Sequence, residues 1–316
     1  MTVFRYALSR LGSLLLVLLV TSFLVFGLLY IASGSPLSFI LGPRGGTPEQ
    51  IAQVTARYHL DDPFFVRYFA WLGDVLHGDL GQSIVYRQPV SDMISSRIAV
   101  TVELVAIAAV IIAIVGVGLG TLASLRGRTL ASTISSFAAV ALSTPVFVIG
   151  VALISVFAVA LGWFPVFGSG TEGIDRLQHL ALPAVALSVG GAAYLVRITR
   201  ASVDEERGKE HVQTAIARAL PRPIVIRRHI LRNAMIPITT VLGLSIASLI
   251  AGSVVVENVF AIDGLGSLLV KAILQRDFAV VQAVVLVLVV GFVVVNAVVD
   301  VLYGFIDPRI GFGRKA

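Results

Sequence analysis

The chain has 316 residues, of which 57% are hydrophobic and 13% are charged. Soluble globular proteins carry roughly 25% charged residues, so this composition excludes a soluble domain and predicts helices surrounded by lipid. The net charge of +6 then indicates cytoplasmic-side membrane loops rather than nucleic-acid binding. The absence of cysteine excludes disulfides, thiolate metal sites and a cysteine nucleophile.

Six segments are apolar enough to cross a bilayer, which requires about 20 residues in helical form. The first, 11–31, follows Arg5 and Arg10 as a signal peptide would, but its apolar run exceeds the roughly 15 residues of that alternative. The others are 104–125, one helix near 133–161 kinked at Pro145 and followed by an outside turn, a short span 180–196 that contains Pro183, 236–256 and 278–299.

Residues 32–98 form a long loop that predicts two helices. Thr47 and Pro48 are typical of an N-cap and first helical residue, and Asp62-Pro63 begins the second helix. Gly78-Asp79-Leu80-Gly81 ends it. Two interpretations stay open with equal weight: a helical cap on the membrane domain, or a docking surface for an external partner. The stripe that serves either role is Phe65, Phe69, Leu72 and Leu76.

The distribution of positive charge predicts the orientation. With the N-terminus inside, most of the 24 Lys and Arg residues lie on the cytoplasmic side, as the positive-inside rule requires. The exception is loop 32–98, but long loops translocate largely regardless of charge. We therefore expect both termini and loop 197–235 to be cytoplasmic.

Loop 197–235 contains a short amphipathic helix. Its apolar residues follow helical spacing, and Pro221 and Pro223 are expected to stop it. Such a helix lies either on the lipid surface or in a groove of a soluble partner. Its small apolar side chains, without Trp or Phe, favour the protein partner. These residues are Val212, Ala215, Ile216, Ala219 and Leu220.

This loop resembles the EAA loop of binding-protein-dependent ABC importer permeases, in their dipeptide, oligopeptide and nickel branch. The match lies in Glu210 to Ala215 with Arg218, and in residues 229–237. Further matches follow in order along the chain: His59-Leu60-Asp61, Gly78 to Gly81, Val102-Glu103-Leu104, Glu257 with Phe260, Gly264-Leu265-Gly266, Arg276-Asp277, and Tyr303 with Asp307-Pro308-Arg309.

Three positions depart from the family pattern. Ala219 replaces the usual glycine, and because alanine is the better helix former by roughly 0.8–1 kcal/mol, the helix is expected to continue to Leu220. Asp263 replaces the proline before Gly264. The Pro-Gly-Asp-Pro turn that the family has after the first span is reduced here to Gly34-Ser35-Pro36.

The resemblance implies an all-α polytopic protein of the bacterial cytoplasmic membrane with the type I ABC importer permease fold and six transmembrane helices. It implies the first permease of a pair, with residues 1–97 as the first span plus the outer loop and 98–316 as a five-helix core. Its partners are then a second homologous permease, one or two ATPase subunits that hold ATP and Mg²⁺, an external binding protein and the bilayer. The implied cargo is di- or oligopeptides, with nickel or another small solute as the alternative.

Three sets of residues are the predicted sites. Asn296 and three serines are polar groups in the last two spans, with interhelical hydrogen bonding as an equal alternative to a role in translocation. The sets are: ATPase coupling by Glu210, Val212, Thr214, Ala215, Ile216, Ala219 and Leu220; the translocation path at Ser245, Ser248, Ser253 and Asn296; and binding-protein docking by Phe65, Phe69, Asp79, Asp263 and Gly264.

Other functions lack their motifs. No phosphate-binding loop is present, since Gly208-Lys209 continues into Glu210, and the five histidines are scattered without a zinc motif. The sequence therefore predicts no enzyme activity, no metal site and no cofactor in this chain. An ion-coupled carrier generally needs ionisable residues near the midplane, and the predicted spans have none there. An intramembrane enzyme lacks a nucleophile and base in the spans.

Overall fold

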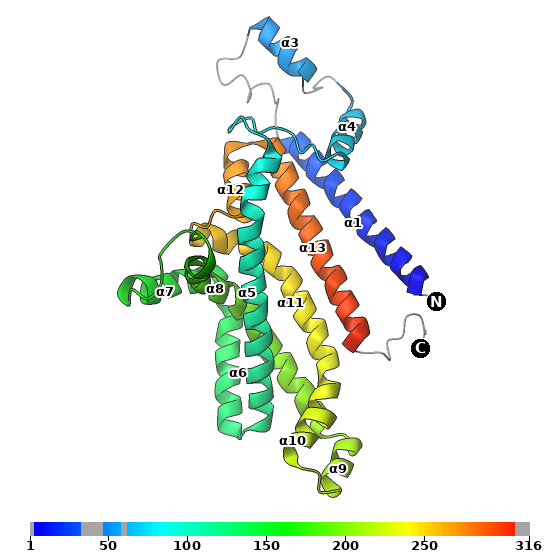
Figure 1. Ribbon diagram of the computed structural model, residues 1–316, viewed down its shortest axis with the longest axis vertical. Helices are drawn as coiled ribbons and strands as arrows, with labels where there is room; N and C mark the ends of the chain where they lie inside the picture. The colour runs from blue at the N-terminus through cyan, green and yellow to red at the C-terminus, as the bar shows by residue number, and fades with distance from the viewer. Residues whose placement is uncertain (1–2, 33–46, 58–61, 307–316) are drawn as a thin grey trace. The chain divides into compact units, whose positions relative to one another are not determined.

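The computed structural model describes residues 3–32, 47–57 and 62–306, and this part is helical apart from loops and one bridge between Gln82 and Pro89. The all-α prediction is confirmed (Figure 1). The quoted motifs at residues 34–36, 59–61 and 307–309 lie outside the described residues. The elements are α1 (Val3–Ala32), α3 (Pro48–Arg57), α4 (Phe64–Leu76), α5 (Val90–Leu125), α6 (Arg128–Ser143), α7 (Val146–Leu153), the π-helix η1 (Ile154–Ala160), α8 (Gly173–Arg207), α9 (Glu210–Ala217), α10 (Arg222–Ile224), the π-helix η2 (Val225–Leu231), α11 (Arg232–Val259), α12 (Leu265–Gln275) and α13 (Phe278–Ile306).

Four of the described helices are long and apolar enough to cross a membrane, and the bent pair α6 with α7–η1 makes a fifth if it is one span. The chain is thus a multi-pass membrane protein. The first predicted span corresponds to α1, of which the described apolar stretch is Leu14–Gly27. The four long spans are Val90–Leu125, Gly173–Arg207, Arg222–Val259 and Phe278–Val298.

The predicted kinked helix near 133–161 is instead two helices. The axes of α6 and of α7–η1 differ by 106°, far more than a proline kink within one helix. Pro145 has no amide hydrogen and disfavours helical geometry at the preceding residue, and Thr144 accordingly has an extended ψ of 124°. The chain therefore turns sharply between α6 and α7.

Helix α8 is much longer than the predicted span 180–196. It has 35 residues, because polar residues at both ends continue the helix beyond the apolar segment that a hydropathy scan detects. Pro183 lies inside α8, and Pro237 lies inside α11. One side of its polar end is buried, including Thr199, Ser202 and Glu206.

The described chain divides into two compact units, and the first contains residues 100–263 and the end of α13 from Phe292. Its buried centre is α8, against which α6, α7 and α11 pack. Helix α5 contacts α8 through glycines. A Cβ atom placed on Gly116 would lie 2.6 Å from Leu195 Cδ2, and one on Gly120 would lie 2.5 Å from Thr199 Cβ. A side chain at either position would clash with α8, so both glycines are required for this close packing.

The second unit contains residues 7–99 and 264–291. Helix α4 packs on α1 through Tyr68, which is buried and lies 2.9 Å from the Ser22 hydroxyl through its Oη atom. Phe69 is 64% exposed and Phe65 is similarly open. The interpretation of Phe65 and Phe69 as a cap core was therefore wrong, because the buried side of α4 is one residue out of phase with that stripe.

Candidate functional site

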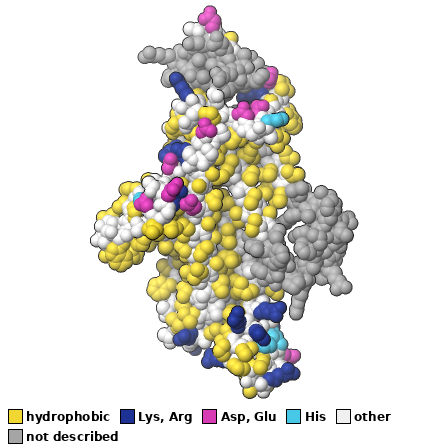
Figure 2. Space-filling view, viewed as in Figure 1, with side chains coloured by type: hydrophobic (Ala, Val, Ile, Leu, Met, Phe, Trp, Pro, Cys, Tyr) yellow, Lys and Arg dark blue, Asp and Glu magenta, His cyan; other side chains and the backbone are white. Residues whose placement is uncertain are grey.

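The amphipathic helix predicted in loop 197–235 is α9, which lies between the ends of α8 and α11. Figure 2 shows Lys and Arg side chains gathered around α9 and α10, at the lower end of the view, beside apolar and histidine side chains. Arg218, Arg222, Arg227 and Arg228 are exposed there. The loop therefore presents a strongly basic surface.

The apolar face of α9 has two parts. Val212 and Ala215 are buried within the chain, in the same cluster as Val225 and Ile230 of the neighbouring π-helix η2. Ile216 is 55% exposed and Leu220 is 37% exposed. The chain itself thus covers half of this face, and only the other half is open to a partner.

Helix α9 does not continue to Leu220, so the sequence-based expectation for Ala219 was wrong. The helix ends at Ala217, and Ala219 adopts a left-handed φ of 55°. Ala219 N donates to Ile216 O at 2.8 Å and Leu220 N donates to Ala215 O at 3.3 Å, the bonds of a Schellman cap. Pro221 enforces this end, because a residue before proline avoids helical geometry.

The two prolines begin the next helix instead of only stopping α9. Pro221 is the N-cap of α10, and Pro223 occupies its first turn, where the missing amide hydrogen costs nothing. Helix α10 continues through η2 into α11. The seven residues of η2 have π geometry. This geometry is rare in proteins, and where it occurs it is often at a functional site.

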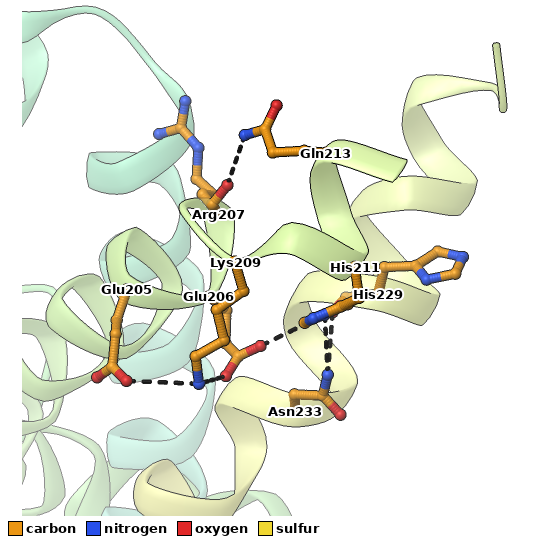
Figure 3. Close-up of polar contacts among 8 residues, drawn as sticks. All are labelled: Glu205, Glu206, Arg207, Lys209, His211, Gln213, His229 and Asn233. Atoms are coloured by element: carbon orange, nitrogen blue, oxygen red, sulfur yellow. Dashed lines mark hydrogen bonds and ion pairs between the residues drawn. The ribbon is translucent and has the colours of Figure 1, made fainter. Parts of the chain in front are cut away.

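A polar network attaches the start of α9 to the end of α8 (Figure 3). The Glu206 side chain is largely buried and accepts a hydrogen bond from Lys209 Nζ, which also lies 3.4 Å from Glu205 Oε1. The hydrogen bond to Glu206 raises the pKa of Lys209 above its ordinary value, so the lysine is charged at neutral pH. Gln213 Nε2 donates to Arg207 O at 3.3 Å.

His211 continues this network toward α11. Its Nε2 atom lies 3.6 Å from Glu206 Oε2, 3.1 Å from His229 O and 3.2 Å from Asn233 Nδ2. Asn233 Nδ2 also donates to His229 O at 3.3 Å. Figure 3 shows the side chains of Glu206, His211 and Asn233 converging from α8, α9 and α11, whereas the His229 ring points away and η2 contributes its backbone carbonyl. Helix α9 is thus fixed to the elements on both sides, so a force on α9 acts directly on α8 and α11.

The predicted translocation residues do not form one set. Ser248 lines a cavity of about 250 Å³ among α6, α7, α8 and α11. Ser245 and Ser253 are buried, and the Ser253 hydroxyl donates to Ile250 O at 2.9 Å. Asn296 Nδ2 donates to Phe292 O at 2.8 Å. The hydroxyls of Ser248 and Ser253 and the amide of Asn296 thus donate within their own helices, and of the four residues Ser248 alone lines this cavity.

The predicted docking residues lie at several loop and helix positions. Phe65 and Phe69 are exposed on α4. Asp79 Oδ1 accepts a hydrogen bond from Gly81 N at 2.8 Å and so stabilises its own turn. Gly264 is the N-cap of α12 and is buried, whereas Asp263 before it is exposed.

Two buried carboxylates were not predicted as site residues. Glu257 is fully buried near the end of α11 and accepts a hydrogen bond from Thr101 Oγ1 at 2.8 Å. Asp277 is fully buried before α13 and accepts one from the Ser83 hydroxyl. The sequence could have indicated a role for Glu257, because it is the only charged residue between 234 and 262.

Comparison with known proteins identifies the family. The model of the binding-protein-dependent transport system inner membrane component matches residues 114–312, and the N-terminal model of such membrane components matches residues 3–105. The chain belongs to this family. Its membership confirms a multi-pass protein of the inner membrane.

Individual relatives match over nearly the whole chain. The glutathione transport system permease protein GsiC of Escherichia coli O6:H1 is 38% identical over 309 residues, 98% of this chain and 99% of the relative. The probable peptide ABC transporter permease protein y4tP of Sinorhizobium fredii is 38% identical over 312 residues, 97% of this chain and 99% of the relative.

Solved structures share the fold. An inward-facing MetNI methionine ABC transporter chain matches with a TM-score of 0.57 and 17% identity, over 67% of this chain and 95% of that one. A chain of an amino acid ABC transporter with histidines matches with a TM-score of 0.53 and 17% identity, over 67% of this chain and 94% of that one. The all-helical fold is therefore that of ABC importer permeases.

Proposed function

We propose that this chain is a membrane-spanning permease subunit of an ATP-driven importer of di- or oligopeptides. The observation that carries the proposal is the full-length relationship, at 38% identity, to permeases named for glutathione and for peptide transport. In this proposal the chain has six transmembrane helices, both termini are cytoplasmic, and residues 98–316 form the core that pairs with a second permease.

Coupling to ATP hydrolysis takes place at α9. Ile216 and Leu220 present an exposed apolar edge beside Arg218 and Arg222, which suits an apolar groove with an acidic rim on an ATPase subunit. Val212 and Ala215 act indirectly, because they attach this helix to η2. ATP and Mg²⁺ are bound by the ATPase subunits, and this chain hydrolyses no ATP.

A binding protein delivers cargo on the opposite side of the membrane. Phe65 and Phe69 are exposed aromatic residues, which are frequent energetic centres of protein interfaces. With Asp79, Asp263 and Gly264 they are the proposed docking residues.

Uptake in membrane vesicles tests the function. The importer, isolated with the proteins that co-purify with this chain, should take up labelled dipeptide or glutathione only with ATP inside and a loaded binding protein outside. Uptake that survives ATP removal but stops when ion gradients are dissipated would instead indicate an ion-coupled carrier. Uptake of labelled nickel without peptide uptake would support the small-solute alternative.

A further inference from the structure

The cavity among α6, α7, α8 and α11 lies at the sharp break between α6 and α7. Thr144 and Val146, on either side of Pro145, both line it. Its volume of about 250 Å³ exceeds the roughly 150 Å³ that holds benzene in an engineered cavity. It is below the roughly 300 Å³ at which ordinary ligand pockets begin. A single amino-acid side chain fits this space, and a whole peptide does not.

The lining selects uncharged groups. None of the described residues that line the cavity is ionisable, so a charged group would be desolvated there without a counter-ion. The Thr144 and Ser248 hydroxyls donate to Val140 O and Ser245 O at 2.8 and 2.7 Å, which leaves their oxygen lone pairs as acceptors. The ends of α6 and α7 also have backbone groups without intrahelical partners.

Three glycines line the cavity, and they differ in the space around them. A Cβ on Gly191 would lie 2.6 Å from Ile112 Cδ1, and one on Gly252 would lie 2.9 Å from Leu187 Cδ1. A Cβ on Gly190 would meet nothing within 4 Å. Gly191 and Gly252 therefore serve helix packing, whereas a side chain at 190 can enter free space.

We propose that this cavity receives one uncharged side chain of the peptide during its passage, and that Gly190 sets the largest side chain that passes. The inference rests on the proposed function, which names peptides as cargo. It assigns a size-selecting role to the break between α6 and α7.

The test is uptake of two dipeptides without ionisable side chains, glycyl-glycine and glycyl-phenylalanine, by the complete importer. Gly190→Ala should reduce uptake of glycyl-phenylalanine about tenfold relative to glycyl-glycine, because overpacking a filled space is unfavourable. Gly190→Leu should abolish uptake of glycyl-phenylalanine and leave uptake of glycyl-glycine, which has no side chain to place in the cavity, largely intact. Gly118 of α5 is a matched control, since its Cβ would also meet nothing within 4 Å and it does not line the cavity. Gly118→Leu should transport both dipeptides normally.

The absence of cysteine allows a second readout. Gly190→Cys in membranes should react with a water-soluble thiol reagent, and a saturating dipeptide with its binding protein should slow the reaction. Labelling only after denaturation in detergent, or a rate that peptide does not change, would overturn the inference. The two failures are distinguishable: a wild-type importer that moves no peptide contradicts the proposed function, whereas normal uptake of glycyl-phenylalanine by Gly190→Leu, or equal loss of both dipeptides, contradicts only the inference.

Discussion

At the scale of single residues, Ala219 is in a conformation that suits glycine. Its φ of 55° is left-handed, which costs an L-residue roughly 1–2 kcal/mol. We expect Ala219→Gly to stabilise the loop by about 0.5–1 kcal/mol, after the larger chain entropy of glycine is subtracted. Slower proteolysis of loop 208–221 in membrane vesicles would measure this gain.

Ala219→Val is the matching control for that experiment. A β-branched side chain is poorly tolerated at positive φ, so this variant should be cleaved faster than the wild type. If Ala219→Gly were cleaved faster as well, the Schellman cap would not be the end of α9 in the membrane.

Two threonines of α5 provide a second comparison. Thr101 donates a hydrogen bond to the buried carboxylate of Glu257, whereas the buried Thr121 Oγ1 has no hydrogen-bond partner. Thr101→Val should therefore destabilise the protein by about 1–3 kcal/mol, and Thr121→Val should be neutral or stabilising. Melting temperatures of the two purified variants in one detergent would show the contrast, and equal melting temperatures would contradict it.

At the scale of elements, the division of the α9 face decides how coupling is tested. Ile216→Glu places a carboxylate on the exposed edge, where a partner groove would desolvate it. We expect normal membrane insertion, normal melting, and at least about tenfold weaker ATPase binding, which corresponds to 1.4 kcal/mol. Co-purification of the ATPase and peptide uptake measure the effect.

The control is Gln213→Glu, which changes an already polar and exposed residue of α9. It loses the hydrogen bond to Arg207 O but should weaken ATPase binding much less than Ile216→Glu does. Ala215→Glu serves less well, because Ala215 is buried within the chain and the change would unfold the loop itself. Equal retention of the ATPase by wild type and Ile216→Glu would show that this edge is not the coupling surface.

Capping and turn residues predicted the ends of α3 and α4 well but not the end of α9, and hydropathy predicted helix lengths poorly. Pro48 begins α3, and α4 ends just before Gly78. The extent of α8 was missed because its ends are polar and one side of them is buried by neighbouring helices. The buried face of α4 was not predicted because this helix has aromatic residues on several sides. Only the packing of α1 against Tyr68 shows which side is buried.

At the scale of the whole molecule, the orientation in the membrane remains a prediction from Lys and Arg. Cysteine at Gln88, an exposed residue of the long loop, should react with an impermeant maleimide on intact cells. Cysteine at Gln213 should react only after the cells are permeabilised. Labelling at position 213 in intact cells would contradict the cytoplasmic location of loop 197–235.

The candidate coupling site was predictable as a segment, but its internal contacts were not. Helical spacing located α9 because amphipathic periodicity depends only on local sequence. The burial of Val212 by η2, and the network from Glu206 through His211 to Asn233, depend on segments that fold back over one another. The cavity beside Gly190 arises from four helices, and no local pattern encodes it.

The glycine contacts between α5 and α8 restrict how this protein moves. With Gly116 and Gly120 packed against Leu195 and Thr199, α5 and α8 fit closely, and separating them would open a void. During a transport cycle α5 and α8 should therefore move together as one rigid body. The conformational change must then occur at hinges elsewhere. Thr144, the extended residue before Pro145, is such a hinge position, and it lines the cavity.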